Sequence, residues 1–243
     1  MGNATAGREV ASELVLPGGR PSKGSDRVVP LGRHGRPKEE IEKIQRDRIL
    51  DAFVIVVGRT GLAKAHVADV CAEAGVSTRE FYAVFLNKDD CFLSAFDAGA
   101  RLVFQGAKQA YEQAEGRWED RLRATLDVVF GLLGANPAFA RLCILESQYA
   151  GPVAGERLSG IVRGFRRTFG GGEIPSLSQD LTGDGLESVL IGGAFRPVVE
   201  YVREGKADRL PELVPLVTYF LTLAVVGPER AARQLTLDRT ALD

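Results

Sequence analysis

The stretch Ala63–Asp90, AKAHVADVCAEAGVSTREFYAVFLNKDD, decides the fold of this 243-residue chain. Val67, Val70 and Cys71 recur at the spacing of one helical face. Gly75 then interrupts the run with a residue that can adopt a positive φ angle at no steric cost. This pattern predicts a short helix that ends in a tight glycine turn.

A second short helix follows the turn at once. Ser77, with Glu80 three residues later, is the signature of a capping box, in which each side chain binds the other residue's backbone amide. Phe81, Val84 and Phe85 then supply one apolar face. Two short helices joined by a glycine turn predict a helix-turn-helix, the motif that places its second helix in the major groove of DNA.

In this region the sequence resembles the tetracycline-repressor-like (TetR/AcrR) family of transcriptional regulators. The motif-level match covers residues 41–100, and beyond them only the helical pattern and the length agree. The resemblance implies an all-α protein with a three-helix, helix-turn-helix DNA-binding head and a larger C-terminal helical domain that binds a ligand and dimerises. The matching residues are Ala74-Gly75-Val76-Ser77, Phe81-Tyr82, Phe85, Lys88 and Asp89-Asp90-Cys91-Phe92.

Two places depart from the family pattern. Glu80 stands where the family usually has a small residue, and Ala65-His66 stands where the family has one or two threonines that contact phosphate. His66 either replaces such a threonine as a donor or is a surface histidine without a ligand. Glu80 either accepts the Ser77 amide in the capping box, which we favour, or accepts a hydrogen bond from a cytosine amino group.

The predicted DNA contacts begin at the N-terminus of the second helix. Thr78 and Arg79 should project into the major groove. Arg79 is the best candidate for reading a base, because it takes the second position of a capped helix directly after the turn. Tyr82 and Lys88 match family positions that touch phosphates, and the Ser77 hydroxyl is a further donor.

Basic residues gather ahead of the first helix. Residues 17–38 contain six Lys or Arg against one acid, whereas the whole chain has a formal net charge of −1. Residues 1–37 are rich in glycine and proline and show no period, which predicts disorder in the free protein. Arg33, Arg36 and Lys38 are candidates for the minor groove of A·T-rich DNA, and a merely solubilising leader is the alternative.

The composition indicates an ordinary folded protein. Hydrophobic residues make up 45% of the chain, enough for a sizeable core. Its three cysteines are widely spaced in apolar helical surroundings, as small core residues in a reducing compartment would be. No signal peptide is expected, and the longest uncharged run, residues 213–228, is shorter than the roughly 20 residues of a membrane span. We therefore expect a cytoplasmic protein.

The side chains that most catalytic sites require are scarce in this chain. Its two histidines are His34, in the glycine-rich tail, and His66, beside the turn, so neither a Ser-His-Asp nor a Cys-His site is expected. Cysteine and histidine do not cluster at zinc-ligand spacing, and Gly170-Gly171-Gly172 lacks the Lys-Ser/Thr of a phosphate-binding loop. We expect no enzyme activity, no cofactor and no metal site.

Helical periodicity continues along the rest of the chain. The expected domains are a disordered basic arm at residues 1–37, a DNA-binding head at 38–87 and a regulatory and dimerisation domain at 88–243. The first helix of the head is expected at residues 38–58. The later helices are expected at residues 88–115, 118–134, 138–149, 152–169, 184–204, 211–226 and 228–235, with a polar loop at 170–183 and no strand.

About 150 residues follow the head, more than DNA binding needs, and the resemblance implies that they sense a small molecule. The effector is expected to be largely apolar, aromatic or lipidic, and ordinary core packing is the alternative role for each candidate residue. Three of the candidates are possible polar anchors, namely Gln105, Glu146 and Arg163. The full candidate lining is Phe104, Gln105, Trp118, Phe130, Glu146, Tyr149, Arg163, Phe165 and Phe195.

Two predicted helices carry a candidate dimer interface. Small residues at 191–194 let another helix approach closely, and the run at 216–226 is too apolar to face water unpaired. Two copies of this helix pair would form an isologous four-helix interface and place two heads on a near-palindromic operator. The candidate interface residues are Ile191, Gly192, Gly193, Ala194, Leu216, Tyr219, Phe220 and Leu223.

The sequence therefore predicts a ligand-responsive repressor that binds double-stranded operator DNA as a homodimer and is released by a small apolar effector. One alternative is a helical interaction or structural protein with a vestigial helix-turn-helix. A DNA-binding activator is the other.

Overall fold

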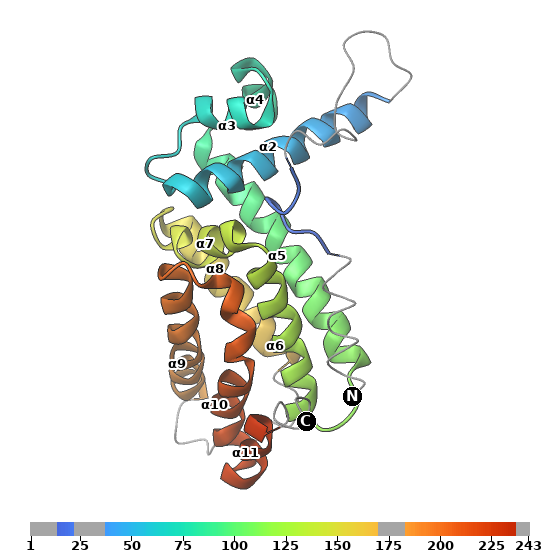
Figure 1. Cartoon of the computed structure of the whole chain (residues 1–243), viewed down its shortest axis with the longest axis vertical. Coiled ribbons are helices and arrows are strands. Elements are labelled where there is room, and N and C mark those ends of the chain that lie inside the picture. The colour runs from blue at the N-terminus through green and yellow to red at the C-terminus, as the bar shows by residue number, and fades with distance from the viewer. Residues whose placement is uncertain (1–13, 22–36, 170–182, 237–243) are drawn as a thin grey trace. The chain divides into compact units, whose positions relative to one another are not determined.

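The structure is a computed structural model that describes residues 14–21, 37–169 and 183–236, all of which are helical or connecting, with no β-strand among them (Figure 1). The all-α prediction is confirmed. The predicted polar loop at residues 170–183 lies outside the described residues except for its last position, and Arg33 and Arg36 lie outside them entirely. The chain divides into two compact units, each of which draws on more than one segment of the sequence.

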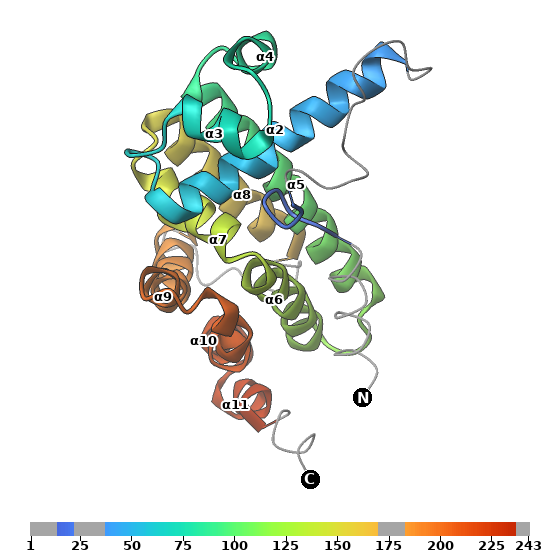
Figure 2. The ribbon, with the colours of Figure 1, turned by 45° about the horizontal axis from the view of Figure 1, so that its top comes forward.

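The first unit, here called the head unit, combines Val15–Leu102 with Asn136–Leu158. The head expected at residues 38–87 lies within this unit, which also contains the start of α5 and a second segment at residues 136–158. In Figures 1 and 2, α3 and α4 lie side by side next to α2. Its elements are α2 (Lys38–Thr60), α3 (Val67–Ala74), α4 (Thr78–Val84), the first part of α5 (Lys88–Gln113), α7 (Pro137–Ile144), the 3-10 helix η2 (Glu146–Gln148) and the start of α8 (Pro152–Phe169).

Aromatic side chains form the core of the head unit. Phe53 of α2 and Phe92 of α5 meet edge to face, with ring centroids 6.4 Å apart, and Phe96 stacks on Phe92 one turn later. Phe81 and Phe85 pack against each other at 5.6 Å. All five rings are buried, so α2, α4 with its capping residue Phe85, and α5 each contribute aromatic side chains to the interior of the head unit.

The glycine turn has the predicted left-handed geometry. Gly75 has φ 64° and ψ 41°, a conformation that costs glycine little and most residues much more. The amides of Gly75 and Val76 both donate to the Cys71 carbonyl oxygen, which closes the end of α3. The predicted helix-turn-helix is thus present, with α3 and α4 as its two helices.

Close approach of α7 to the long helices depends on two more glycines. A Cβ atom at Gly58 of α2 would lie 2.6 Å from the Cβ of Ala138. At Gly99 of α5, a Cβ would overlap the ring of Phe139, which is fully buried. Glycine at these positions lets α7 pack directly on the backbones of α2 and α5.

The expectation of disorder for residues 1–37 is wrong for a segment near their middle. Leu16 is only 1% exposed, and the Gly18 amide donates to Oδ1 of Asp51 on α2 at 2.7 Å. Gly18 has φ 84°, and a Cβ there would overlap Val54. The segment at residues 15–21 therefore packs on α2 as part of the head unit, because this contact removes the apolar Leu16 side chain from water.

The second unit, here called the C-terminal unit, contains the described residues of Met1–Leu14, Val103–Ala135 and Ser159–Asp243. Each predicted helix in this region is present, with shifts of a few residues at the ends. In Figure 2, α9, α10 and α11 follow one another within this unit. Its elements are the end of α5, α6 (Trp118–Ala135), the end of α8, α9 (Gly183–Arg203), the 3-10 helix η3 (Ala207–Leu213), α10 (Val214–Val226) and α11 (Pro228–Thr236).

Two helix boundaries differ from prediction for local reasons. The helix expected to begin at Pro211 begins at Val214, and residues 207–213 form a 3-10 helix instead. Pro211 and Pro215 lack the backbone N–H, which favours short turns there and a helix start just before Pro215. The helix expected at residues 138–149 ends at Ile144 and continues as the 3-10 turn η2.

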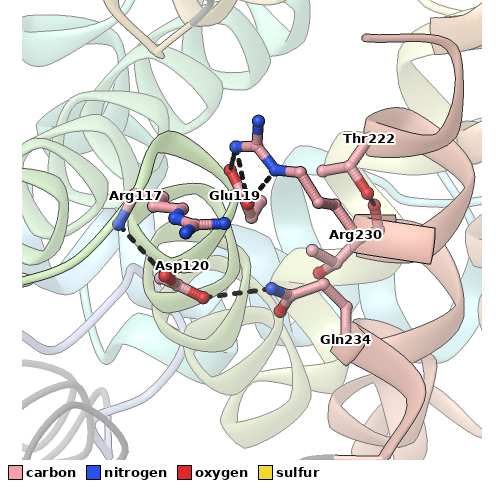
Figure 3. Close-up of polar contacts among 7 residues, drawn as sticks. Arg117, Glu119, Asp120, Thr222, Arg230 and Gln234 are labelled. Carbon is pink, nitrogen blue, oxygen red and sulfur yellow. Dashed lines mark hydrogen bonds and ion pairs between the residues drawn. The ribbon is translucent and has the colours of Figure 1, made fainter. Parts of the chain in front are cut away.

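An ion pair and hydrogen bonds join the start of α6 to α11 within the C-terminal unit (Figure 3). The Arg230 guanidinium binds both carboxylate oxygens of Glu119, at 2.8 and 2.9 Å. The Gln234 side-chain amide donates to Oδ1 of Asp120 at 3.1 Å, and Arg123 donates to the backbone carbonyl oxygen of Gln234. Because Glu119 is buried, these contacts fix where α11 docks on α6.

No single helix in the described parts of the chain is long and apolar enough to cross a membrane. One bent pair of segments, Trp118–Ala135 with Pro137–Gln148, meets that criterion by length and composition alone.

Candidate nucleic-acid interface

The capping box at the start of α4 is formed as predicted. The Ser77 amide and hydroxyl donate to Oε2 of Glu80 at 2.7 and 2.8 Å, and the Glu80 amide donates to the Ser77 hydroxyl oxygen at 3.2 Å. These hydrogen bonds, first that of the Ser77 amide and then that of its hydroxyl, hold the pKa of Glu80 below its usual value, against the opposing effect of burial. The capping interpretation of Glu80 is confirmed.

The outward face of α4 carries the predicted base-reading side chains. Thr78 and Arg79 are exposed, and Tyr82, one turn later, is 54% exposed. Phe81, between them, is fully buried and holds the helix to the core. His66, the residue before α3, is also exposed, with extended backbone angles. The polar face of α4 is thus exposed to solvent, while its apolar face is held in the protein interior.

The Ser77 hydroxyl on this face already has a partner, because it donates to Glu80. Burial is the main reason that the pKa of the nearby Cys71 thiol is raised. Arg79 and Tyr82 are therefore better placed for direct DNA contact than Ser77, whose hydroxyl binds within the head unit.

Lys88 has a structural role that the sequence did not predict. Its ammonium donates to the carbonyl oxygens of Leu62 and Ala65, at 2.9 and 3.2 Å, in the loop between α2 and α3. An ammonium has three hydrogens, so one further donor remains. The predicted phosphate contact of Lys88 stays a prediction, and it would use a side chain already fixed by the loop.

Glu146, expected as a possible effector anchor, binds the same loop through its carboxylate. It is buried in the head unit, where its carboxylate accepts the Leu62 amide at 2.9 Å and pairs with Arg141 at 3.1 Å. A buried carboxylate needs such partners because desolvation penalises its charge. The periodicity of α7 showed an apolar helix and gave no sign of this contact.

The remaining candidates for the effector site differ in burial and belong to two units. Phe104 and Phe165 meet edge to face at 5.5 Å in the C-terminal unit. Gln105, next to Phe104 on the helix, is exposed, as is Arg163, whose charge favours water. Tyr149 belongs to the head unit and is 79% exposed. In the C-terminal unit, Trp118 and Phe130 are core residues and Phe195 is half-buried.

The small residues of α9 are partly used within the chain. A Cβ atom at Gly193 would lie 2.8 Å from the Phe220 ring of α10, so these two helices approach closely. Leu216 is 51% exposed, Phe220 is 37% exposed, and Val189, which the sequence did not single out, is 67% exposed. Of the other interface candidates, Gly192 is exposed, and Ile191, Ala194, Tyr219 and Leu223 are half-buried.

This arrangement is that of a helix-turn-helix head, with a capped second helix, attached to a larger helical unit. The chain matches no protein-family model. It is 23% identical to the fatty acid metabolism regulator protein of Bacillus subtilis (strain 168) over 186 residues, which are 74% of this chain and 93% of that protein.

Two solved structures share the fold. The fatty acid degradation regulator FadR from Bacillus halodurans has a TM-score of 0.63 and 22% identity, over 75% of this chain and 95% of its own. The transcriptional regulator FadR from Bacillus subtilis, in complex with stearoyl-CoA, has a TM-score of 0.63 and 21% identity, over 76% of this chain and 98% of its own. The chain therefore shares the all-α fold of these two structures, with a helix-turn-helix and a C-terminal helical domain.

Proposed function

We propose that the protein is a DNA-binding transcriptional repressor of the TetR/AcrR type that a fatty acyl thioester releases from its operator. The observation that carries the proposal is the capped helix α4, which presents Arg79 and Tyr82 to solvent directly after the Gly75 turn. An exposed helix at this position of a helix-turn-helix is the element that enters the major groove. The similarity to the Bacillus regulators supports this reading.

The effector class is proposed from two observations. One of the similar structures is a FadR in complex with stearoyl-CoA. In this chain, the Phe104–Phe165 pair offers apolar surface in the C-terminal unit, in keeping with the largely apolar effector that the sequence suggests. A long-chain acyl-CoA combines an apolar tail with a polar head, so it is the first ligand to test.

We further propose that α9 and α10 form a homodimer interface. Val189, Leu216 and Phe220 leave apolar side chains exposed on these two helices, and burying such side chains stabilises association. Sedimentation at micromolar concentration should give a dimer, and Leu216→Glu with Phe220→Glu should give a folded monomer. A wild-type monomer with full helicity would remove this part of the proposal.

DNA binding is tested by selecting sequences from a random duplex pool with the wild-type protein. Arg79→Ala should weaken binding to the enriched duplex by about 1–3 kcal/mol and relax the preference at one base position. Arg101→Ala, at an exposed arginine of α5, is the matched control and should change neither quantity. If the wild-type protein enriches no sequence, the helix-turn-helix is vestigial and the proposed function is wrong.

The basic segment ahead of α2 is tested by salt dependence. If Arg33, Arg36 and Lys38 neutralise phosphates, changing all three to alanine should flatten the plot of log K against log[salt] by roughly two to three units per subunit. Equal slopes for the wild-type and the triple-alanine proteins would instead identify the segment as a solubilising leader.

The effector proposal is tested by adding stearoyl-CoA, free CoA or stearate to the complex with the enriched duplex. Stearoyl-CoA should release the DNA and raise the melting temperature of the protein, because a ligand that binds only the folded state stabilises it. Free CoA should do neither. Release by an unrelated apolar compound and not by stearoyl-CoA would keep the repressor and overturn the effector class.

A further inference from the structure

The carboxyl end of α3 is held by an arginine from α2. Nη2 of Arg48 donates to the Ala74 carbonyl oxygen at 2.6 Å and makes a longer contact with the Gly75 carbonyl oxygen at 3.4 Å. The last carbonyl oxygens of a helix have no partner within it, and a cation beside them also interacts favourably with the helix dipole. The Arg48 side chain therefore binds backbone carbonyl groups of the turn that joins α3 to α4.

Two neighbours of Arg48 on α2 reach the ends of α4 itself. The Gln45 side-chain amide donates to Oε1 of Glu80 at 3.4 Å, on the carboxylate that caps α4. The Arg46 guanidinium lies over the Phe85 ring, 4.9 Å from its centroid, at the other end of α4. A cation over an aromatic face at this distance is attractive. One stretch of α2 thus contacts the turn, the start and the end of α4.

These contacts matter because α4 is short and follows the turn directly. It has seven residues, and helices this short are not stable alone. Within α4, all of which the structure describes, Phe81 is the one fully buried residue. Phe81, together with the buried Phe85 that ends the helix, holds one face of α4, but the direction in which α4 leaves α3 is set at the turn.

A nearby ion pair provides a contrast. Arg59, also on α2, pairs with Glu73 of α3, but its side chain is 61% exposed and it binds a side chain rather than the turn backbone. Exposed ion pairs of this kind contribute little to stability. Arg59 therefore contacts α3 through an exposed side-chain pair, whereas Arg48 contacts the backbone at the end of α3.

We infer that Arg48 is a positioning residue for DNA recognition. By holding the Ala74 and Gly75 carbonyl groups, it sets the direction in which α4 leaves the turn, and so the direction in which Arg79 points. The inference rests on the proposed DNA-binding function, but its structural part concerns the free protein and can be measured without DNA.

The experiment compares Arg48→Met, Arg48→Lys and the matched control Arg59→Met with the wild-type full chain. Amide hydrogen exchange in the absence of DNA reports on Val76, whose amide is bonded in the turn, and on Glu80, whose amide is bonded in the cap. Arg48→Met should accelerate exchange at both amides by roughly tenfold, as expected for the loss of a hydrogen bond from a charged group. Arg59→Met should not change it, and Arg48→Lys should recover part of the protection.

The second readout is the ratio of affinities for the duplex enriched by the wild-type protein and for a random-sequence duplex. Arg48→Met should lower this ratio about tenfold, while binding of the random duplex is kept, because phosphate contacts tolerate a misdirected helix better than base contacts do. Arg48→Lys should recover part of the ratio.

The outcomes separate the positioning role from the proposed function. Exchange at Val76 and Glu80 unchanged in Arg48→Met would overturn the positioning role, whatever the protein binds. A lower melting temperature with an unchanged affinity ratio would show that Arg48 only stabilises the fold, and would overturn it too. Faster exchange in Arg48→Met, combined with a wild-type protein that enriches no DNA sequence, would support the role of Arg48 in holding α4 and overturn the proposed DNA recognition.

Discussion

Gly99 offers a test of how tightly α7 packs on α5 in the head unit. Replacing a glycine inside a helix by alanine ordinarily stabilises a protein by about 1 kcal/mol through helix propensity. At Gly99, however, the new Cβ would overlap three carbons of the Phe139 ring, and even the farthest of them, Cε1, would be 2.9 Å away. Phe139 is fully buried, so its ring has little room to move.

The two effects can be weighed against each other. Overpacking a core typically costs about 1–3 kcal/mol, and an overlap this deep with an aromatic ring belongs at the upper end of that range. We therefore expect Gly99→Ala to lower the free energy of unfolding by about 1–2 kcal/mol after the gain in propensity. Urea denaturation followed by circular dichroism measures this change.

Gly155 of α8 is the matched control, because it lies in the same unit and a Cβ there would meet no atom within 4 Å. Gly155→Ala should be neutral or stabilising by up to about 1 kcal/mol. Combining Gly99→Ala with Phe139→Leu should relieve the overlap, giving a favourable coupling energy of about 1–2 kcal/mol in a double-mutant cycle. A Gly99→Ala protein as stable as Gly155→Ala would refute the packing described for α7.

Three further predictions concern single contacts. The pKa of Glu80 is lowered in the folded protein, so its cap should stabilise the protein fully above pH 4.5, the ordinary pKa of the carboxyl group, and lose its effect as the pH falls through the lowered folded-state pKa. Glu80→Gln should therefore lower the free energy of unfolding by about 0.5–1 kcal/mol at pH 7 and flatten the acid side of a plot of stability against pH. Leu16→Ala should cost about 2–3 kcal/mol in urea denaturation, whereas Leu86→Ala, at an 84% exposed residue of the same unit, should change stability by less than about 0.5 kcal/mol. Arg230→Met should lower the free energy of unfolding by about 1–3 kcal/mol, because it leaves the buried Glu119 carboxylate unpaired. Adding Glu119→Gln should recover part of this loss. Equal stability of the wild-type and Arg230→Met proteins would show that the pair contributes nothing.

The helix-turn-helix could be predicted from the sequence because its determinants are local. A capping box needs two residues three apart, and a left-handed turn needs a glycine in one position. Both features act within a few residues, so Ser77, Glu80 and Gly75 identified them before any tertiary contact was known. The helical periods were informative for the same reason, and most helix bounds agree within a few residues.

The contacts that hold the motif in place could not be predicted, because their partners are distant in sequence. Glu146 binds the amide of Leu62, 84 residues away, and Lys88 binds two carbonyl groups in the same loop. A carboxylate or ammonium shows its type in a sequence but not its partner. Gly18 and Leu16 were missed for a related reason, since a glycine-rich segment with one short apolar run resembles a linker until a surface for that run is known.

The division of the two units has a consequence for how this protein can be dissected or recombined. Residues 136–158 belong to the head unit although they follow α6 of the C-terminal unit, so the chain passes between the units four times, after Leu14, Leu102, Ala135 and Leu158. A fragment that stops at residue 87 or 102 would lack α7, leaving Gly58 and Gly99 without the helix packed on them. A chimaera that exchanges one regulator's head for another's must therefore carry two separate segments. An exchange made at a single junction would break up the core it was meant to transplant.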